Sequence, residues 1–60
     1  MKIRKATELR RGMRISMDGN WLELIRVNPT SHPVPMLQLL FLNGRSVLAR
    51  PDEEFVVKDD

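Results

Sequence analysis

The chain has 60 residues, with 10 lysines and arginines, 8 aspartates and glutamates, a net charge of +2 and no cysteine. A chain of this length predicts one domain, residues 1–60, which buries only about 60% of the surface that its unfolded form exposes. Without cysteine it has neither a disulfide nor a thiolate metal site, which suits a reducing compartment. No apolar run approaches the roughly 20 residues that span a bilayer. We therefore expect a cytoplasmic protein without a membrane segment.

Charge is unevenly distributed along the chain. Residues 1–14 carry six cations and one acidic residue, whereas residues 51–60 carry five acidic residues and one cation. Seven of the ten cations are arginine, whose planar guanidinium suits phosphate groups and base edges. The basic start of the chain is therefore the candidate for contact with nucleic acid.

The first half of the chain predicts a turn and a hairpin. Residues 6–12 are too few for a stable helix and are expected to form a turn that tucks Leu9 inward. Residues 13–17 alternate apolar and polar side chains, which is typical of a half-buried strand. Asp18-Gly19-Asn20 then reverses the chain, because these residues tolerate positive φ. In the next strand, residues 21–27, the inward phase slips near Leu24, which predicts a β-bulge or a sharp bend.

The second half predicts a loop, a second hairpin and a short last strand. Residues 28–35 contain three prolines and are expected to be a loop, with His32 as a solvated side chain. Residues 36–42 are the most apolar run and have the length of a strand, and Asn43-Gly44 closes a hairpin onto residues 45–49. Residues 50–54, with Pro51 near their start, predict one turn of 3₁₀ helix. Residues 55–57 then form a last short strand, and residues 58–60 a frayed tail.

This order of elements predicts an all-β fold, namely a single small SH3-like five-stranded barrel with one 3₁₀ turn before the last strand. In such a barrel a few strongly bent strands form two orthogonal sheets around one core. The expected core consists of twelve apolar side chains: Leu9, Met13, Ile15, Leu22, Leu24, Val27, Leu37, Leu39, Phe41, Val47, Phe55 and Val57.

One segment resembles a known family. The pattern Ala6-x-x-Leu9-Arg10-x-Gly12-Met13-x-Ile15-x-Met17-Asp18-Gly19 is similar to the opening of the N-terminal SH3-like domain of elongation factor P and its eukaryotic relative, and to KOW-type barrels of translation and transcription proteins. The resemblance implies the SH3-like fold. The family's modified lysine, carried by a Pro-Gly-Lys-Gly-like motif, has no counterpart in residues 28–35, which contain neither lysine nor glycine. The family's activity is therefore not expected here.

The residue types that catalysis needs are scarce. The chain has one histidine, His32, and its serines lie beside no obvious base. The acidic run Asp52, Glu53 and Glu54 follows Pro51 and predicts a charged start of a helical turn, whereas a metal site needs several ligands held together. We therefore expect no enzyme, no cofactor, no metal and no small-molecule substrate.

The first candidate binding surface is an apolar outer face. If Leu37, Leu39 and Phe41 point inward, the alternate side chains point outward, and an exposed apolar cluster on a small domain marks an interface. The predicted protein interface consists of Met36, Gln38, Leu40, Leu42 and Leu48. It favours a non-enzymatic bacterial or phage binding module that contacts a partner protein or a second copy of itself. The alternative is that the loop or the termini cover this face.

The second candidate is an RNA- or DNA-binding surface. Small barrels bind nucleic acid with aromatic rings beside basic residues, and Trp21 is the stacking candidate because Phe41 and Phe55 fit the core. The acidic residues Asp18 and Glu23 flank Trp21 and count against this interpretation. The predicted nucleic-acid surface consists of Lys2, Arg4, Lys5, Arg10, Arg11, Arg14 and Trp21.

Overall fold

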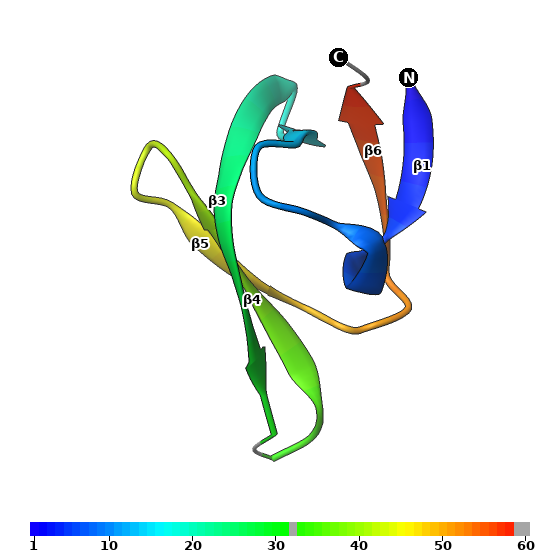
Figure 1. Ribbon diagram of the computed structural model, residues 1–60, viewed down its shortest axis with the longest axis vertical. Coiled ribbons are helices and arrows are strands. Elements are labelled where there is room, and N and C mark those ends of the chain that lie inside the picture. Colours follow the sequence, from blue (N-terminus) through cyan, green and yellow to red (C-terminus); the bar gives the residue numbers. More distant parts are fainter. Residues whose placement is uncertain (32, 59–60) are drawn as a thin grey trace.

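The protein is all-β in the computed structural model, which describes residues 1–31 and 33–58 (Figure 1). Its strands form one antiparallel sheet in the order β1-β6-β2-β3-β4-β5. The elements are β1 (Lys2–Lys5), the 3₁₀ turn η1 (Ala6–Glu8), β2 (Arg14–Met17), β3 (Asn20–Thr30), β4 (Met36–Phe41), β5 (Ser46–Ala49) and β6 (Glu54–Lys58). The predicted solvated histidine, His32, and the last residues of the predicted tail, Asp59 and Asp60, lie outside the described residues.

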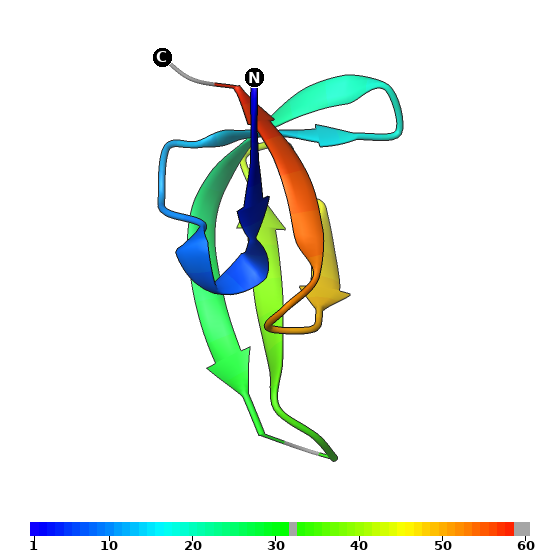
Figure 2. The same cartoon turned by 90° about the vertical axis from the view of Figure 1, so that its right-hand side faces the viewer.

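β3 belongs to both halves of the sheet and bends between them. Its start pairs with β2, and its end pairs with β4. Leu24 lies opposite Phe41 and Arg26 lies opposite Leu40, so Ile25 is an extra residue on the β3 side of the ladder. Such a bulge bends a strand, and β3 curves from one half of the sheet into the other in Figure 2. The predicted slip in phase near Leu24 is confirmed.

Both predicted hairpin turns are present. Asp18 and Gly19 have φ of 53° and 80° and link Met17 to its partner Asn20, which is the two-residue turn that positive φ permits. The second hairpin has a longer loop. Phe41 accepts a hydrogen bond from Gly44 N–H (3.0 Å) and donates its own N–H to the Arg45 carbonyl (2.9 Å), and Gly44 has φ of 88°. Residues 42–44 therefore form a three-residue loop that ends in a left-handed glycine bulge.

The sheet has six strands instead of the predicted five, and it is not closed into a barrel. β1 and β5 are its two edges. The additional strand is β1, which has the sequence Lys-Ile-Arg-Lys and pairs with β6 from Lys2 opposite Val57 to Lys5 opposite Glu54. It lacks the apolar alternation of a half-buried strand, but charged side chains suit the edge of a sheet. Local sequence pattern therefore does not reveal it.

The single 3₁₀ turn does not precede the last strand. It lies at Ala6–Glu8, where the Glu8 carboxylate accepts the Lys5 N–H at 2.8 Å. The segment at Pro51 is an ordinary turn, closed by a hydrogen bond from Glu53 N–H to the Arg50 carbonyl at 3.0 Å. Among the described residues no helix is long and apolar enough to span a membrane.

The predicted loop of residues 28–35 is shorter in the structure. β3 continues to Thr30, and Pro29 lies opposite Leu37 of β4. From Arg26 to Thr30, β3 pairs with β4, and none of the described strands pairs with its other side. A proline is tolerated on such an edge segment, since the side away from the partner needs no N–H donor.

The core lies between the two halves of the sheet. All twelve predicted core residues are either buried or packed against the buried cluster. Ala6 and Ala49 are also buried, at 1% and 0% exposure, and were not predicted because small side chains carry a weak hydrophobic signal. Within residues 1–31 and 33–58 no polar or charged side chain is buried, so the core itself offers no chemistry.

Candidate binding surfaces

The outer face of β3, β4 and β5 contains most of the predicted protein interface. Cross-strand rows place Leu40 between Arg26 and Ser46, and Gln38 between Asn28 and Leu48. Leu48 is 62% exposed, whereas Met36, Gln38 and Leu40 are half-buried. Apolar and polar side chains therefore alternate across this face, and Leu48, on the edge strand β5, is its most exposed apolar residue.

Leu42 lies away from these rows. It is 67% exposed because it is the first residue of the β4–β5 loop and not the last residue of the strand. Its N–H donates to the Glu23 carbonyl at 2.9 Å, which holds it beside the start of β3. The five residues of the predicted interface are thus divided between two places.

An open groove, the Trp21 groove, lies where Leu42 meets the β2–β3 hairpin. It has a volume of about 390 Å³ and is lined by Arg14, Trp21, Leu22, Glu23, Leu42 and Asn43. Trp21 is 40% exposed, and the Lys58 ammonium lies 5.9 Å from the centroid of its ring, within cation–π range. The groove brings together Arg14 and Trp21 from the predicted nucleic-acid surface with Leu42 from the predicted protein interface.

A second groove, the Arg26 groove, lies at the bulge of β3. It has a volume of about 750 Å³ and is lined by Arg11, Ile25, Arg26, Val27 and Leu40. Ile25 is 40% exposed because the bulge places it outside the ladder. Neither Ile25 nor Arg26 was predicted as a site residue. The phase slip at Leu24 was the signal that could have identified them, since the residue after it must leave the core face.

The six cations predicted to bind nucleic acid do not form one surface. Lys2, Arg4 and Lys5 lie in β1 at one edge of the sheet. The Arg10 guanidinium Nη1 donates to the carbonyls of Thr7 (3.2 Å) and Leu9 (3.0 Å), so it holds the chain around η1. The remaining two cations line different grooves, Arg11 the Arg26 groove and Arg14 the Trp21 groove.

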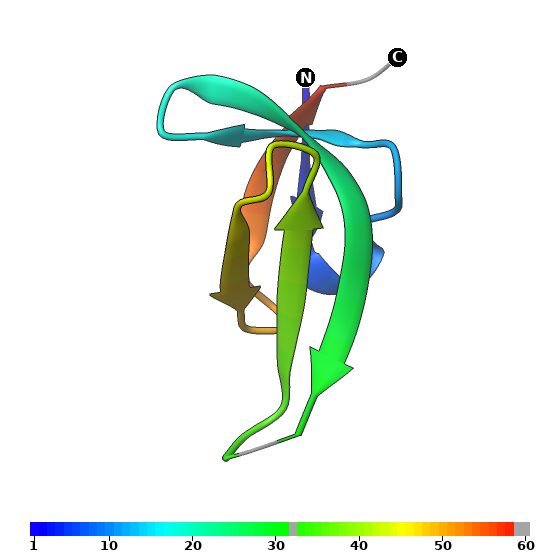
Figure 3. The ribbon, with the colours of Figure 1, turned by 90° about the vertical axis from the view of Figure 1, so that its left-hand side faces the viewer.

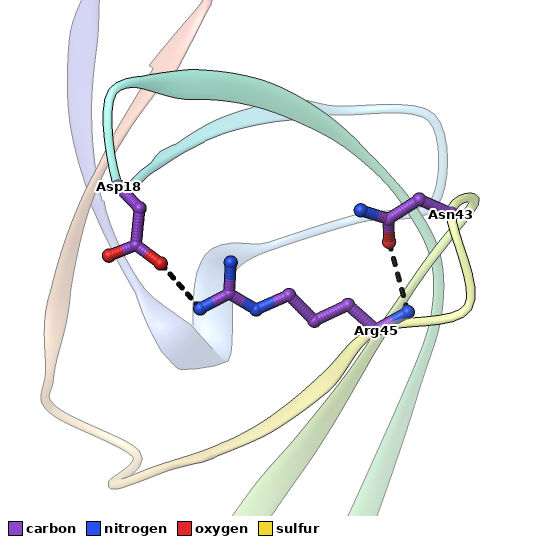
Figure 4. Close-up of polar contacts among 3 residues, drawn as sticks. All are labelled: Asp18, Asn43 and Arg45. Carbon is purple, nitrogen blue, oxygen red and sulfur yellow. Dashed lines mark hydrogen bonds and ion pairs between the residues drawn. The ribbon is translucent and has the colours of Figure 1, made fainter.

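Arg45 connects the two hairpin turns. Its guanidinium contacts the Asp18 carboxylate at 2.5 Å, and its N–H donates to Asn43 Oδ1 at 2.9 Å (Figure 4). The ion pair is exposed, with 43% of the Arg45 side chain and 69% of the Asp18 side chain accessible. It links the residue before β5 to the β2–β3 turn.

The described residues contain no group of three or more histidine, aspartate or glutamate side chains placed to hold a metal ion. Comparison with known proteins gives no match: no family model, no curated protein and no solved structure is significantly similar to the chain. The resemblance of residues 6–19 to elongation factor P therefore stays a prediction.

Proposed function

We propose that the protein is a non-enzymatic binding module that acts through protein–protein contact, as a partner of another protein or of a second copy of itself. The contact surface is the outer face of β3, β4 and β5 together with the Arg26 groove. Interfaces of this kind combine exposed apolar side chains with arginine.

The supporting observation is that Leu48 is exposed on the same face as Leu40, and that Leu40 lines a groove together with two arginines. A partner that covers Leu48, which is 62% exposed, would remove its apolar surface from water and so stabilise the contact. Arg11 and Arg26 around Ile25 and Leu40 would suit a partner that presents acidic side chains at its rim.

The test is affinity capture with the full chain as bait, comparing the parent with Leu40→Glu. A partner bound through the proposed surface is captured by the parent and lost with the variant. Val34→Glu is the control, because it places the same charge on an apolar residue that is 54% exposed and lies outside the proposed surface, in the connection between β3 and β4. Capture that is equal for all three proteins would contradict the proposal.

The Trp21 groove supports a second candidate function, binding of single-stranded RNA or DNA. An exposed aromatic ring beside arginine is the usual platform for an unstacked base, and Arg14 and Trp21 line the same groove. Glu23 also lines this groove, and its negative charge would repel a phosphate group. The proposed contact is therefore a base that stacks on Trp21, and not a bound phosphate.

The nucleic-acid candidate is tested by fluorescence titration of Trp21, the one tryptophan of the chain. Mixed oligonucleotides at low salt should quench its emission, and Trp21→Ala should cost about 1–3 kcal/mol of binding free energy. Unchanged emission together with no salt-sensitive binding would eliminate this candidate and leave the protein-contact function.

The finer features of the fold and the cellular context belong to the same proposal. We infer that β2 to β6 are an SH3-like five-stranded unit that remains open, since β3 bends at its bulge and serves both halves of the sheet. The absence of cysteine supports a reducing compartment, and we place the protein in the cytoplasm of a bacterium or of a phage-infected cell.

A further inference from the structure

The free edge of β5 carries unpaired backbone groups. Because Phe41 N–H bonds to the Arg45 carbonyl and antiparallel pairs alternate between bonded and non-bonded, the next bonded pairs are Leu39 with Val47 and Leu37 with Ala49. Ser46 and Leu48 therefore direct their N–H and C=O groups away from β4. No described residue bonds to these four groups, and both residues are exposed.

The opposite edge, β1, is protected against pairing. Ala6 N–H bonds to the Glu53 carbonyl at 2.8 Å, so the same alternation turns the backbone groups of Ile3 and Lys5 outward. The Lys5 N–H is occupied by the Glu8 carboxylate, and three of the four β1 side chains are cations. Lysine on an edge strand opposes the approach of another strand, whereas β5 has no charged residue.

We propose that β5 pairs with β5 of a second copy, antiparallel, around a two-fold axis at Val47. This inference rests on the proposed protein-contact function and names the partner. With Ser46 opposite Leu48 of the second copy, all four outward groups of one strand meet the complementary groups of the other. The ladder then holds four hydrogen bonds between the copies.

Charge and side-chain placement favour this pairing over the other ways in which two copies can meet. Pairing of β1 with β1 of a second copy would place cations opposite cations. Pairing of β1 with β5 would bring the β1 cations near Arg45 and Arg50, and as a head-to-tail contact it would produce open filaments. In the β5–β5 register Arg50 lies opposite Gly44 of the second copy, so no two cations are directly opposed. The two Leu48 side chains become diagonal neighbours on the outer face and cover each other.

The experiment compares sedimentation of the full chain at micromolar to millimolar concentration for the parent, Ser46→Pro and Ser46→Ala. Proline removes an outward N–H that no strand of the same copy uses, while alanine keeps it. The parent and Ser46→Ala should form dimers, and Ser46→Pro should raise the dissociation constant about tenfold or more. Amide exchange should in parallel show that the Ser46 and Leu48 amides of the parent gain protection as its concentration rises.

The sedimentation data can overturn the pairing in three ways. A parent that stays monomeric throughout, or a Ser46→Pro variant that associates like the parent, contradicts it. Association that survives Ser46→Pro but is lost with Leu40→Glu would show that the outer face, and not the edge, holds the copies together, so the proposed function would stand while the edge pairing falls. Circular dichroism shows whether Ser46→Pro is folded. If it is not, Leu48→Pro replaces it in the sedimentation experiment. The amide exchange of the parent then provides the second test, because the pairing requires Leu48 to gain protection as concentration rises.

Discussion

The two edges of the sheet are built from the same kind of four-residue antiparallel strand, yet they treat an approaching strand in opposite ways. β1 covers one outward N–H with Glu8 and surrounds the rest with lysine and arginine. β5 leaves its outward groups open between uncharged side chains. Figure 3 shows β5 beside β4. Protection of an edge is therefore a local property of each strand, and in this sheet it leaves β5 as the edge that is open to pairing.

The largest expected effect comes from a proline at a position of β5 whose N–H points toward β4. Val47 directs its N–H toward β4, so Val47→Pro removes a bond inside the sheet and leaves a β4 carbonyl without its donor. We expect a loss of about 2–3 kcal/mol of unfolding free energy, measured by urea denaturation. Ser46→Pro, the neighbouring control, should cost less than about 1 kcal/mol. Equal losses for the two variants would mean that the alternation of inward and outward groups on β5 is wrong.

The next effect concerns the loop that holds β5 in place. Gly44 has φ of 88°, and β5 is joined to the sheet through β4 alone. Gly44→Val should therefore destabilise the fold by about 1–3 kcal/mol, because a β-branched residue is strained at positive φ. Gly44→Asn should cost less, since asparagine tolerates the left-handed region. Denaturant midpoints test this order, and a neutral Gly44→Val would contradict the left-handed bulge.

Removal of the protection on β1 should have a moderate effect. Glu8→Ala frees the Lys5 N–H, which the carboxylate accepts at 2.8 Å, and should lower the unfolding free energy by about 1 kcal/mol. Glu8→Gln retains an acceptor oxygen and should cost less. The exchange rate of the Lys5 amide measures the same bond directly. An amide that exchanges equally fast in the parent and in Glu8→Ala would show that this edge is not capped.

The smallest effect is expected at the ion pair beside β5. Asp18→Asn removes the charge that Arg45 contacts at 2.5 Å, but both side chains are exposed. Such pairs contribute about 0.2–1 kcal/mol, and less at high salt. Thermal unfolding of the parent and the variant at low and high salt should reveal a difference that shrinks as salt is added. A difference that is independent of salt would point to a packing role for Asp18.

Short-range chemistry made much of this fold predictable. The two hairpins follow from Asp18-Gly19 and Asn43-Gly44, and the bend of β3 follows from the slip at Leu24. β1 was missed because its only support is a partner at the other end of the chain, Val57 opposite Lys2, which no local alternation records. The continuation of β3 through Pro29 was missed because a proline lacks the N–H that an inner strand needs. Pro29 is tolerated because, among the described strands, β3 pairs only with β4 at this position.

The candidate site was less predictable than the fold. Alternation correctly placed Leu48 outward, but it could not place Leu42 beside Trp21, because these residues meet through the backbone bond to Glu23 and not through a shared strand. The sequence also could not show that the basic residues lie on different surfaces. Arg10, for example, donates hydrogen bonds to carbonyls of its own turn, which a run of cations in sequence does not reveal. Each groove is lined by residues from different elements, which only the folded sheet brings together.

The position of β6 has a consequence for the route by which the chain folds. Although it is the last strand in sequence, it lies between β1 and β2, with Val57 opposite both Lys2 and Ile15. The β2–β3 and β4–β5 hairpins join residues close in sequence, whereas β6 joins partners that most of the chain separates, and such long-range pairings form slowly. We expect the hairpins to form first and insertion of β6 to limit the folding rate. In that case the shortening of Val57 to alanine would slow folding, because the contacts of β6 form in the rate-limiting step.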